Sequence, residues 1–184
     1  MVSLNPPVCN FGWQAPQFDL PGVDGRHWSL AEIAGEKGLL VMFICNHCPY
    51  VQAILKRLVS DLEILKTMGI NAVAISSNDA VNYPQDSFEK MKEVSELFEF
   101  GFPYLFDESQ LVAKTYGAVC TPDFFGFNAE MKLQYRGRFD NQGRDSTPKP
   151  EATKDLLEAM SLVAKTGKGP IDQIASIGCS IKWK

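Results

Sequence analysis

The amino-acid sequence predicts an α/β fold, and three features of the chain indicate this class. The segments 39–44 and 70–76 are short apolar runs, as expected of strands that are buried on both faces of a sheet. Between them, apolar residues recur every three or four positions, which is typical of an amphipathic helix. A strand, a helix and a second strand of these lengths predict a parallel pair joined by a right-handed crossover.

Length and composition are those of one folded, water-soluble domain. The chain has 184 residues, and single cores of roughly 100 to 200 residues are the norm. Apolar residues make up 45% of the chain and charged residues 22%, close to the averages for globular proteins. We therefore expect residues 1–184 to form a single domain with extended terminal segments, 1–16 and 167–184.

Charge and hydropathy argue against several classes of partner. The 18 Lys and Arg and the 22 Asp and Glu give a formal net charge of -4, and the sequence contains no run of basic residues. We therefore expect no nucleic-acid partner. No stretch approaches the roughly 18 apolar residues of a spanning helix, so we expect no membrane partner. Residues 1–11 lack the pattern of a secretory signal peptide, and we therefore expect a cytoplasmic protein.

The remaining elements predict a central mixed sheet flanked by helices. Two short runs, 17–20 and 26–30, flank a turn-forming cluster and indicate an N-terminal β-hairpin. The helix between the two core strands starts after Pro49. The second half of the chain is expected to contain helices 84–98, 108–116 and 151–164, strand 104–106, and an antiparallel pair, 124–127 and 133–139. A β-α-β half is thus followed by a β-β-α half.

Five cysteines are too few for a disulfide scaffold, and their odd number leaves at least one thiol unpaired within the chain. Two of them lie in the motif Cys45-Asn46-His47-Cys48, between a core strand and the long helix. A helix N-terminus stabilises a thiolate. We therefore expect Cys45 to be the more acidic and more exposed nucleophile and Cys48 to be shielded. His47 would place a donor or a positive charge near the Cys45 sulfur.

Two other interpretations of this pair stay open. The cysteines are half of a zinc site if further ligands approach, although tetrahedral zinc takes four ligands and the chain has no second close pair. Alternatively both thiols are inert, because free cysteine is often buried. A close pair in a reducing compartment is more often catalytic, redox-sensing or metal-binding than structural, and its place at a strand-to-helix junction favours redox chemistry.

Several segments together carry a resemblance to a known family. They are 12–18, the strand leading into 45–51, 119–125 and 135–140. In these segments the chain resembles the thioredoxin superfamily, and more narrowly the peroxiredoxin-like redoxins related to alkyl hydroperoxide reductase and thiol-specific antioxidant proteins. Its last residues, 177–184, resemble the tail of one peroxiredoxin-like subgroup.

The resemblance implies a thioredoxin-like fold and a thiol-disulfide oxidoreductase that needs no bound cofactor. Cys45 matches the attacking thiol and Cys48 the resolving thiol. Pro122 matches the proline that follows a cis peptide bond beside the active site, and Thr121 would offer its backbone to a bound substrate chain. The implied partners are protein or small-molecule disulfides, hydroperoxides in a peroxidase, and a thiol reductant.

Two alternatives to disulfide exchange remain. A peroxiredoxin-like thiol peroxidase is the first, but in those enzymes threonine and proline precede the reactive cysteine by three and seven positions. Alignment on Cys48 places Cys45 and Val41 there instead. The second is a metal-binding module in which Cys45, Cys48 and a histidine supply soft ligands.

Other residues are accessory candidates. Asn46 lies inside the motif, and Arg138 is either a guide for an anionic substrate or a surface ion-pair partner. Cys120 lies two residues before Pro122 and is expected near the active-site face, where packing is favoured over a mixed disulfide. The terminal cysteines Cys9 and Cys179 can reach the site or pair with each other.

Overall fold

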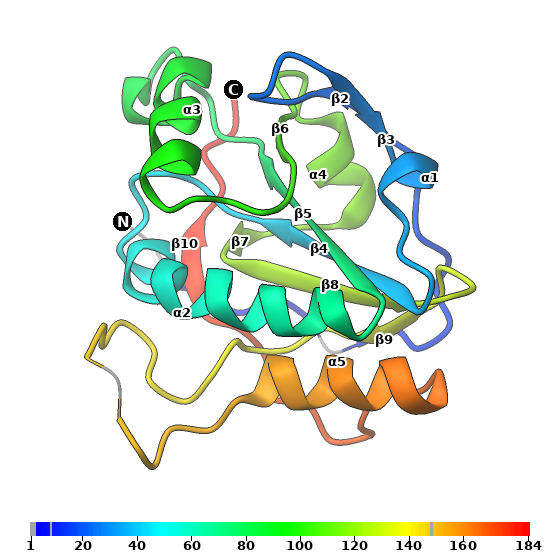
Figure 1. Cartoon of the computed structure of the whole chain (residues 1–184). Helices are drawn as coiled ribbons and strands as arrows, with labels where there is room; N and C mark the ends of the chain where they lie inside the picture. Colours follow the sequence, from blue (N-terminus) through cyan, green and yellow to red (C-terminus); the bar gives the residue numbers. More distant parts are fainter. Residues whose placement is uncertain (1–2, 8, 148) are drawn as a thin grey trace.

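The computed structural model describes residues 3–7, 9–147 and 149–184 and is built around a mixed β-sheet (Figure 1). Its strand order is β6-β5-β4-β8-β9. The strands are β4 (Gly38–Phe43), β5 (Ile70–Ser76), β6 (Tyr104–Phe106), β8 (Asp123–Asn128) and β9 (Leu133–Tyr135). β4 is parallel to β5, and β5 to β6, whereas β8 is antiparallel to both β4 and β9. The expected α/β class and mixed sheet are confirmed.

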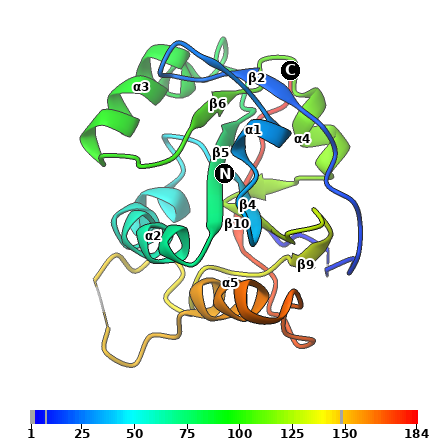
Figure 2. The same cartoon turned by 45° about the vertical axis from the view of Figure 1, so that its right-hand side comes forward.

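Helices cover both faces of this sheet (Figures 1 and 2). The helices α2 (Pro49–Thr67), α3 (Phe88–Leu97) and α5 (Asp155–Thr166) contribute to the core on one face. The hairpin β2 (Asp19–Pro21) and β3 (His27–Ser29), with α1 (Leu30–Ile33) and α4 (Leu111–Tyr116), contributes to the core on the other. Every residue of β4 is buried because its side chains alternate between these two cores.

Some helices are shorter than expected, and local backbone geometry explains two of the differences. The segment 84–98 divides into the 3-10 turn η1 (Pro84–Asp86) and α3, because Ser87 is extended and its hydroxyl caps α3 by accepting from the Lys90 amide. Gln110 is left-handed, so α4 begins after it. α5 starts at Asp155, and β9 ends at Tyr135.

A second, smaller sheet was not expected. Among the described residues it consists of β1 (Ser3–Leu4), β10 (Gly178–Ser180) and β7 (Cys120–Thr121), in the order β1-β10-β7. Both pairings are antiparallel. The C-terminal strand therefore lies between the N-terminal strand and the strand that leads into Pro122.

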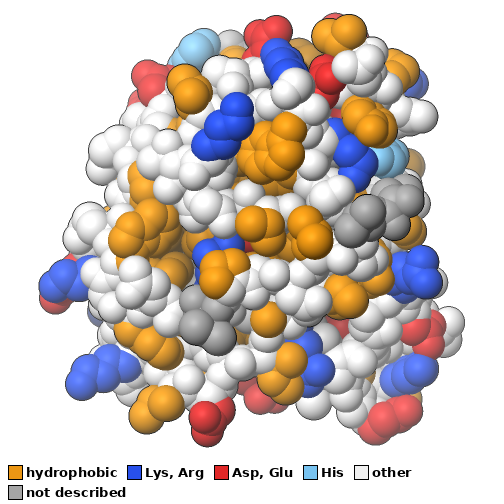
Figure 3. Space-filling model, turned by 180° about the vertical axis from the view of Figure 1, so that it is seen from behind, with side chains coloured by type: hydrophobic (Ala, Val, Ile, Leu, Met, Phe, Trp, Pro, Cys, Tyr) orange, Lys and Arg blue, Asp and Glu red, His pale blue; other side chains and the backbone are white. Residues whose placement is uncertain are grey.

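Surface properties agree with the low net charge. On the face opposite to that of Figure 1, side chains of both charges are interspersed with hydrophobic ones (Figure 3). Among the described helices, including the 19-residue α2, none combines the length and apolar character that crossing a membrane requires.

Candidate active site

Cys48 occupies the N-cap of α2, at the carboxyl end of β4. The helix begins at Pro49, where the missing backbone N–H costs no hydrogen bond. The backbone carbonyl of Cys48 accepts from the amide of Gln52 at 2.9 Å. Cys45 lies three residues earlier, outside the helix. The positive end of the helix dipole is therefore adjacent to Cys48 rather than to Cys45.

Cys48 is shielded as expected, but Cys45 is not the exposed thiol that the sequence suggested. Both side chains are buried. The interaction with Cys48, together with burial and the negative charge of Asp86, raises the pKa of Cys45 well above its usual value. The same contact, with those to Cys179 and Thr121, outweighs burial and lowers the pKa of Cys48 to about 5.

Thr121 contacts both thiols of the motif. Its Oγ1 lies 3.3 Å from the Cys45 sulfur, and its carbonyl oxygen accepts from the protonated Cys48 thiol at 3.0 Å. The peptide bond between Thr121 and Pro122 is cis, as expected. The end of β4, the start of α2 and β7 therefore converge on one thiol pair.

Cys179 belongs to the same cluster, a placement that the sequence left open. It is buried on β10, opposite Thr121 in the strand register. Its sulfur lies 2.9 Å from that of Cys48, within hydrogen-bond distance. Burial, and then the contact with Cys48, raises the pKa of Cys179 to about 12. The site thus holds three thiols, and the one with the lowest pKa is Cys48.

The other two cysteines have different surroundings. Cys120 is buried, its thiol donates to the Pro122 carbonyl oxygen at 3.5 Å, and burial raises its pKa strongly. Cys9 packs against the core on the opposite side of the sheet from Cys48 and Cys179. Burial raises the pKa of Cys9 to about 11. Cys120 is thus packed in the interior, and Cys9 does not approach Cys179.

Asp86 is a site residue that the sequence did not indicate, because it lies in an irregular segment without a motif. Its side chain is fully buried and accepts four hydrogen bonds. The donors are the amide of Asn46 at 2.8 Å, the amide and Nδ1 of His47 at 3.3 and 2.6 Å, and Nδ2 of Asn78 at 2.7 Å. The His47 ring also stacks on Tyr83, with 5.7 Å between centroids. The carboxylate therefore fixes the backbone and the imidazole between the two cysteines.

Both polar atoms of the Asn46 side-chain amide form hydrogen bonds. Its Oδ1 accepts from the Tyr104 hydroxyl at 2.9 Å, and its Nδ2 donates to the Gln85 carbonyl oxygen at 3.0 Å. Burial, together with the charge of Asp86, raises the pKa of Tyr104 well above its usual value, so Tyr104 stays a donor. Asn46 thus serves to hold the loop rather than to contact a substrate.

One group of side chains has the spacing of a metal site. Donor atoms of Cys45, His47 and Asp86 all lie within 4.8 Å of one another. However, an ionised carboxylate has about four lone-pair sites, and four protein donors already use those of Asp86. The group is therefore satisfied as a hydrogen-bond network.

Two arginines flank the segment after Pro122. Arg138 forms an ion pair with Asp155 at 2.9 Å near the surface, which matches the ion-pair interpretation. Arg136, which the sequence did not single out, pairs with the fully buried Asp123 at 2.9 Å and donates to the Gly117 carbonyl oxygen at 2.8 Å. Because Asp123 directly follows Pro122, this ion pair anchors the start of β8.

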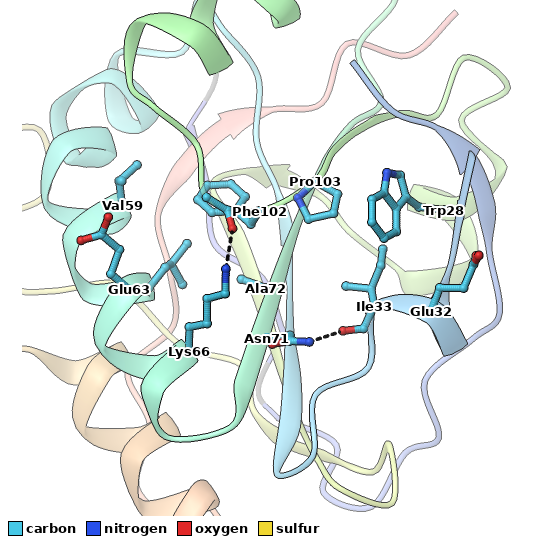
Figure 4. Close-up of a pocket in the computed structure, with 12 residues that line it drawn as sticks. Trp28, Glu32, Ile33, Val59, Glu63, Lys66, Asn71, Ala72, Phe102 and Pro103 are labelled. Carbon is cyan, nitrogen blue, oxygen red and sulfur yellow. Dashed lines mark hydrogen bonds between the residues drawn. The ribbon is translucent and has the colours of Figure 1, made fainter. Parts of the chain in front are cut away.

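The pocket drawn in Figure 4 lies away from the thiols. A pocket of about 320 Å³ is lined by Trp28, Ile33, Lys66 and Asn71, at the amino end of β5 (Figure 4). The thiols lie beyond the carboxyl end of β4, which is parallel to β5. Beside Pro122 there is a cavity of only about 30 Å³. The thiol cluster is therefore closed in this conformation.

The fold and the thiol cluster define a thioredoxin-like redox protein. The chain belongs to the AhpC/TSA family, which matches residues 11–136. This agrees with the peroxiredoxin-like resemblance of its sequence.

Solved structures extend the comparison to the whole chain. An uncharacterized conserved protein from Geobacillus kaustophilus is 41% identical, with a TM-score of 0.92 over 100% of this chain and 97% of that chain. A hypothetical protein from Sinorhizobium meliloti 1021 is 39% identical, with a TM-score of 0.88 over 98% of each chain. The thioredoxin domain of a thiol-disulfide oxidoreductase from Bacteroides vulgatus shares the fold at 19% identity, with a TM-score of 0.58 over 68% of this chain and 86% of that chain. No match was found among curated proteins.

Proposed function

We propose that the protein is a thiol-disulfide oxidoreductase in which Cys48 attacks a disulfide and Cys45 resolves the mixed disulfide. The observation that carries this proposal is the position of Cys48 at the N-cap of α2, with Cys45 three residues before it. The lowered pKa of Cys48 agrees with this role. The lowered pKa favours the thiolate of Cys48, the form of cysteine that reacts. The roles are the reverse of those implied by the sequence resemblance.

The reaction has two exchange steps. In the first, the Cys48 thiolate attacks one sulfur of the substrate, a new S–S bond forms, and the other substrate sulfur leaves as a thiolate that takes up a proton. In the second, Cys45 loses its proton and attacks the Cys48 sulfur, and the remaining substrate thiolate leaves with that proton. The substrate disulfide gains two electrons and the protein is left with a Cys45–Cys48 disulfide. A thiol reductant then restores the two protein thiols.

The surrounding residues position the pair. Asp86 holds the amides of Asn46 and His47, so the loop between the cysteines keeps its shape through the cycle. Thr121 contacts both sulfurs and fixes their approach to β7. His47 acts through its hydrogen bond to Asp86, 2.6 Å long. These three are positioning residues.

A thiol peroxidase is the second candidate, because the AhpC/TSA family and the low pKa of Cys48 both favour it. Against it, Cys45 and Val41 stand where the peroxiredoxins have threonine and proline. The presence of a thiol rather than a hydroxyl three residues before Cys48 supports disulfide exchange. A cytoplasmic location, where thiol reductants are abundant, is part of the proposal.

Single-turnover rates with two oxidants separate the candidates. The reduced protein is mixed with oxidised glutathione or with an organic hydroperoxide, and loss of free thiols is followed. Disulfide exchange predicts that thiols are lost faster with oxidised glutathione than with the hydroperoxide. It also predicts that Cys48→Ser loses no thiol at the motif. Faster reaction with the hydroperoxide, with sulfenic acid at Cys48, would instead establish the peroxidase.

A further inference from the structure

The strand β10 lies where a polypeptide substrate of a thioredoxin-like protein would pair. It is antiparallel to β7, with Cys179 opposite Thr121 and Ser180 opposite Cys120. The pairing continues with a hydrogen bond from the Ile181 amide to the Val119 carbonyl oxygen, 3.2 Å long. The backbone edge that precedes Pro122 is therefore already paired, by the chain's own C-terminal segment.

This strand presents a sulfur to Cys48. The Cys179 and Cys48 sulfurs are 2.9 Å apart, and a disulfide needs about 2.05 Å. The two atoms therefore have to approach by less than roughly 1 Å to form a bond.

The position of Cys179 is held from both sides. β1 pairs with the far edge of β10, with Ser3 opposite Cys179. Beyond the strand, the amide of Lys182 donates to Asn78 Oδ1 and its carbonyl oxygen accepts from Gln110 Nε2, at 2.9 and 2.8 Å. A thiol fixed in this way reacts as an intramolecular partner, without the entropic cost of binding a separate molecule.

We propose that β10 is an internal substrate: Cys179 forms a disulfide with Cys48 in the oxidised protein, and Cys45 releases it as it would release a bound substrate. The inference rests on the proposed attack by Cys48 and adds the chain's own tail to its substrates. A polypeptide disulfide then reaches Thr121 only when β10 leaves β7.

The chemistry balances with oxidised glutathione as the oxidant. The Cys48 thiolate attacks one glutathione sulfur, giving a Cys48–glutathione disulfide and a glutathione thiolate, which takes up a proton. Cys179 then loses its proton and attacks the Cys48 sulfur, so that a Cys48–Cys179 disulfide forms and the second glutathione leaves as a thiol. Finally, Cys45 attacks Cys48, which gives the Cys45–Cys48 disulfide and returns Cys179 to a thiol.

The other cysteines supply natural controls. Cys120 is also buried and lies on β7, but its thiol contacts the Pro122 carbonyl oxygen rather than a sulfur. Cys9 packs on the other side of the sheet. Neither shares the short sulfur contact of Cys179, so neither is expected to cross-link to Cys48.

Removal of Cys45 should trap the internal disulfide. In Cys45→Ser, the tryptic peptide 38–56 contains Cys48 as its single cysteine, and peptide 169–182 contains only Cys179. The reduced variant is treated with oxidised glutathione, the remaining thiols are alkylated, and the digest is analysed by mass spectrometry. We expect the cross-linked pair of peptides as the main product, and the same product in Cys45→Ser/Cys120→Ser.

The outcomes distinguish this inference from the proposed function. In Cys45→Ser/Cys179→Ser the cross-link should be lost and Cys48 should keep glutathione; Cys45→Ser/Cys179→Ala repeats the test without a buried hydroxyl. If Cys48 in Cys45→Ser keeps glutathione while Cys179 stays free, the internal-substrate inference is overturned and the attack by Cys48 stands. If Cys48 acquires neither glutathione nor a cross-link in any variant, both proposals are wrong. Thermal melts compare the folding of all variants.

Discussion

The thiols of Cys45 and Cys48 interact in the buried site, and this contact raises the pKa of Cys45 and lowers that of Cys48. Cys45 keeps its proton more tightly, and the anionic form of Cys48 is favoured. The two thiols of the motif, alike in sequence, therefore differ in acidity in the folded protein. The position of Cys48 at the N-cap of α2 acts in the same direction.

The first prediction concerns this titration. The ultraviolet absorbance of thiolates in the reduced protein should rise with a midpoint near pH 5, because the pKa of Cys48 is lowered to about 5. The thiolate is present above this pH and is lost as the pH falls through it. Cys48→Ser should remove the step and Cys120→Ser should keep it. A first step near the usual thiol pKa of about 8.5 would contradict the account.

The second prediction concerns Asp86. Asp86→Asn removes a negative charge that raises the pKa of Cys45, so that pKa should fall. The variant should also lose stability, on the order of 2 kcal/mol, because hydrogen bonds to a buried charged group contribute about 1.5–3 kcal/mol. Thiolate titration and urea unfolding measure the two effects.

Asp107→Asn is the matched control for Asp86. Asp107 is another fully buried carboxylate, which accepts from the Ser77 hydroxyl and the Ala113 amide, both at 2.9 Å. Its substitution should lower stability and leave the thiol titration unchanged. If both variants shift the Cys45 titration equally, the charge of Asp86 is not the cause.

The third prediction compares two neighbouring arginines. Arg136→Ala leaves the buried Asp123 carboxylate without its partner, which typically costs 3–5 kcal/mol. Arg138→Ala breaks a partly exposed ion pair with Asp155, for which the typical cost is below about 1 kcal/mol. Urea unfolding of the reduced variants checks the difference. Equal losses of stability in the two variants would show that the ion pair after Pro122 does not anchor β8. In a kinetic assay, a raised KM in Arg138→Ala alone would show that Arg138 guides an anionic substrate.

The fourth prediction concerns Gly178, at the start of β10. A Cβ at this position would lie 2.2 Å from the carbonyl oxygen of Thr121, so Gly178→Ala must push β10 away from β7. Alkylation of Cys48 by iodoacetamide should become faster, and the protein should lose about 1–3 kcal/mol of stability, as is typical of overpacking.

Gly101→Ala provides the control, because a Cβ there meets nothing within 4 Å. It should change neither Cys48 alkylation nor stability by more than about 0.5 kcal/mol, the usual range for surface substitutions. If Cys48 in Gly178→Ala is alkylated at the wild-type rate, β10 does not control access to Cys48.

Sequence patterns were sufficient for the main sheet and its long helix. The apolar run of β4 reflects burial on both faces, and the three- and four-residue spacing of α2 reflects burial on one. By contrast, β1, β7 and β10 have only two or three residues each, too few to show a period. Their pairing is a tertiary effect, and the place of Cys179 depends on it.

The thiol motif was visible in the sequence, but the order of its two pKa values was not. That order follows from which cysteine caps α2 and from the contact between the two thiols, and both depend on the path of the loop. Asp86 fixes this loop from a segment about forty residues away, with no motif of its own. Tyr104 likewise lies in a short strand that shows no sign of its contact with Asn46.

The most direct test of the central claim is to locate the first mixed disulfide. Reduced Cys45→Ser/Cys179→Ser and reduced Cys48→Ser are each mixed with one equivalent of oxidised glutathione, quenched at short times and mapped by mass spectrometry. The account predicts rapid modification of Cys48 in the first variant, and no modification of Cys45 on that timescale in the second. Equally rapid modification of Cys45 in Cys48→Ser, with Cys48 unmodified in the first variant, would contradict it.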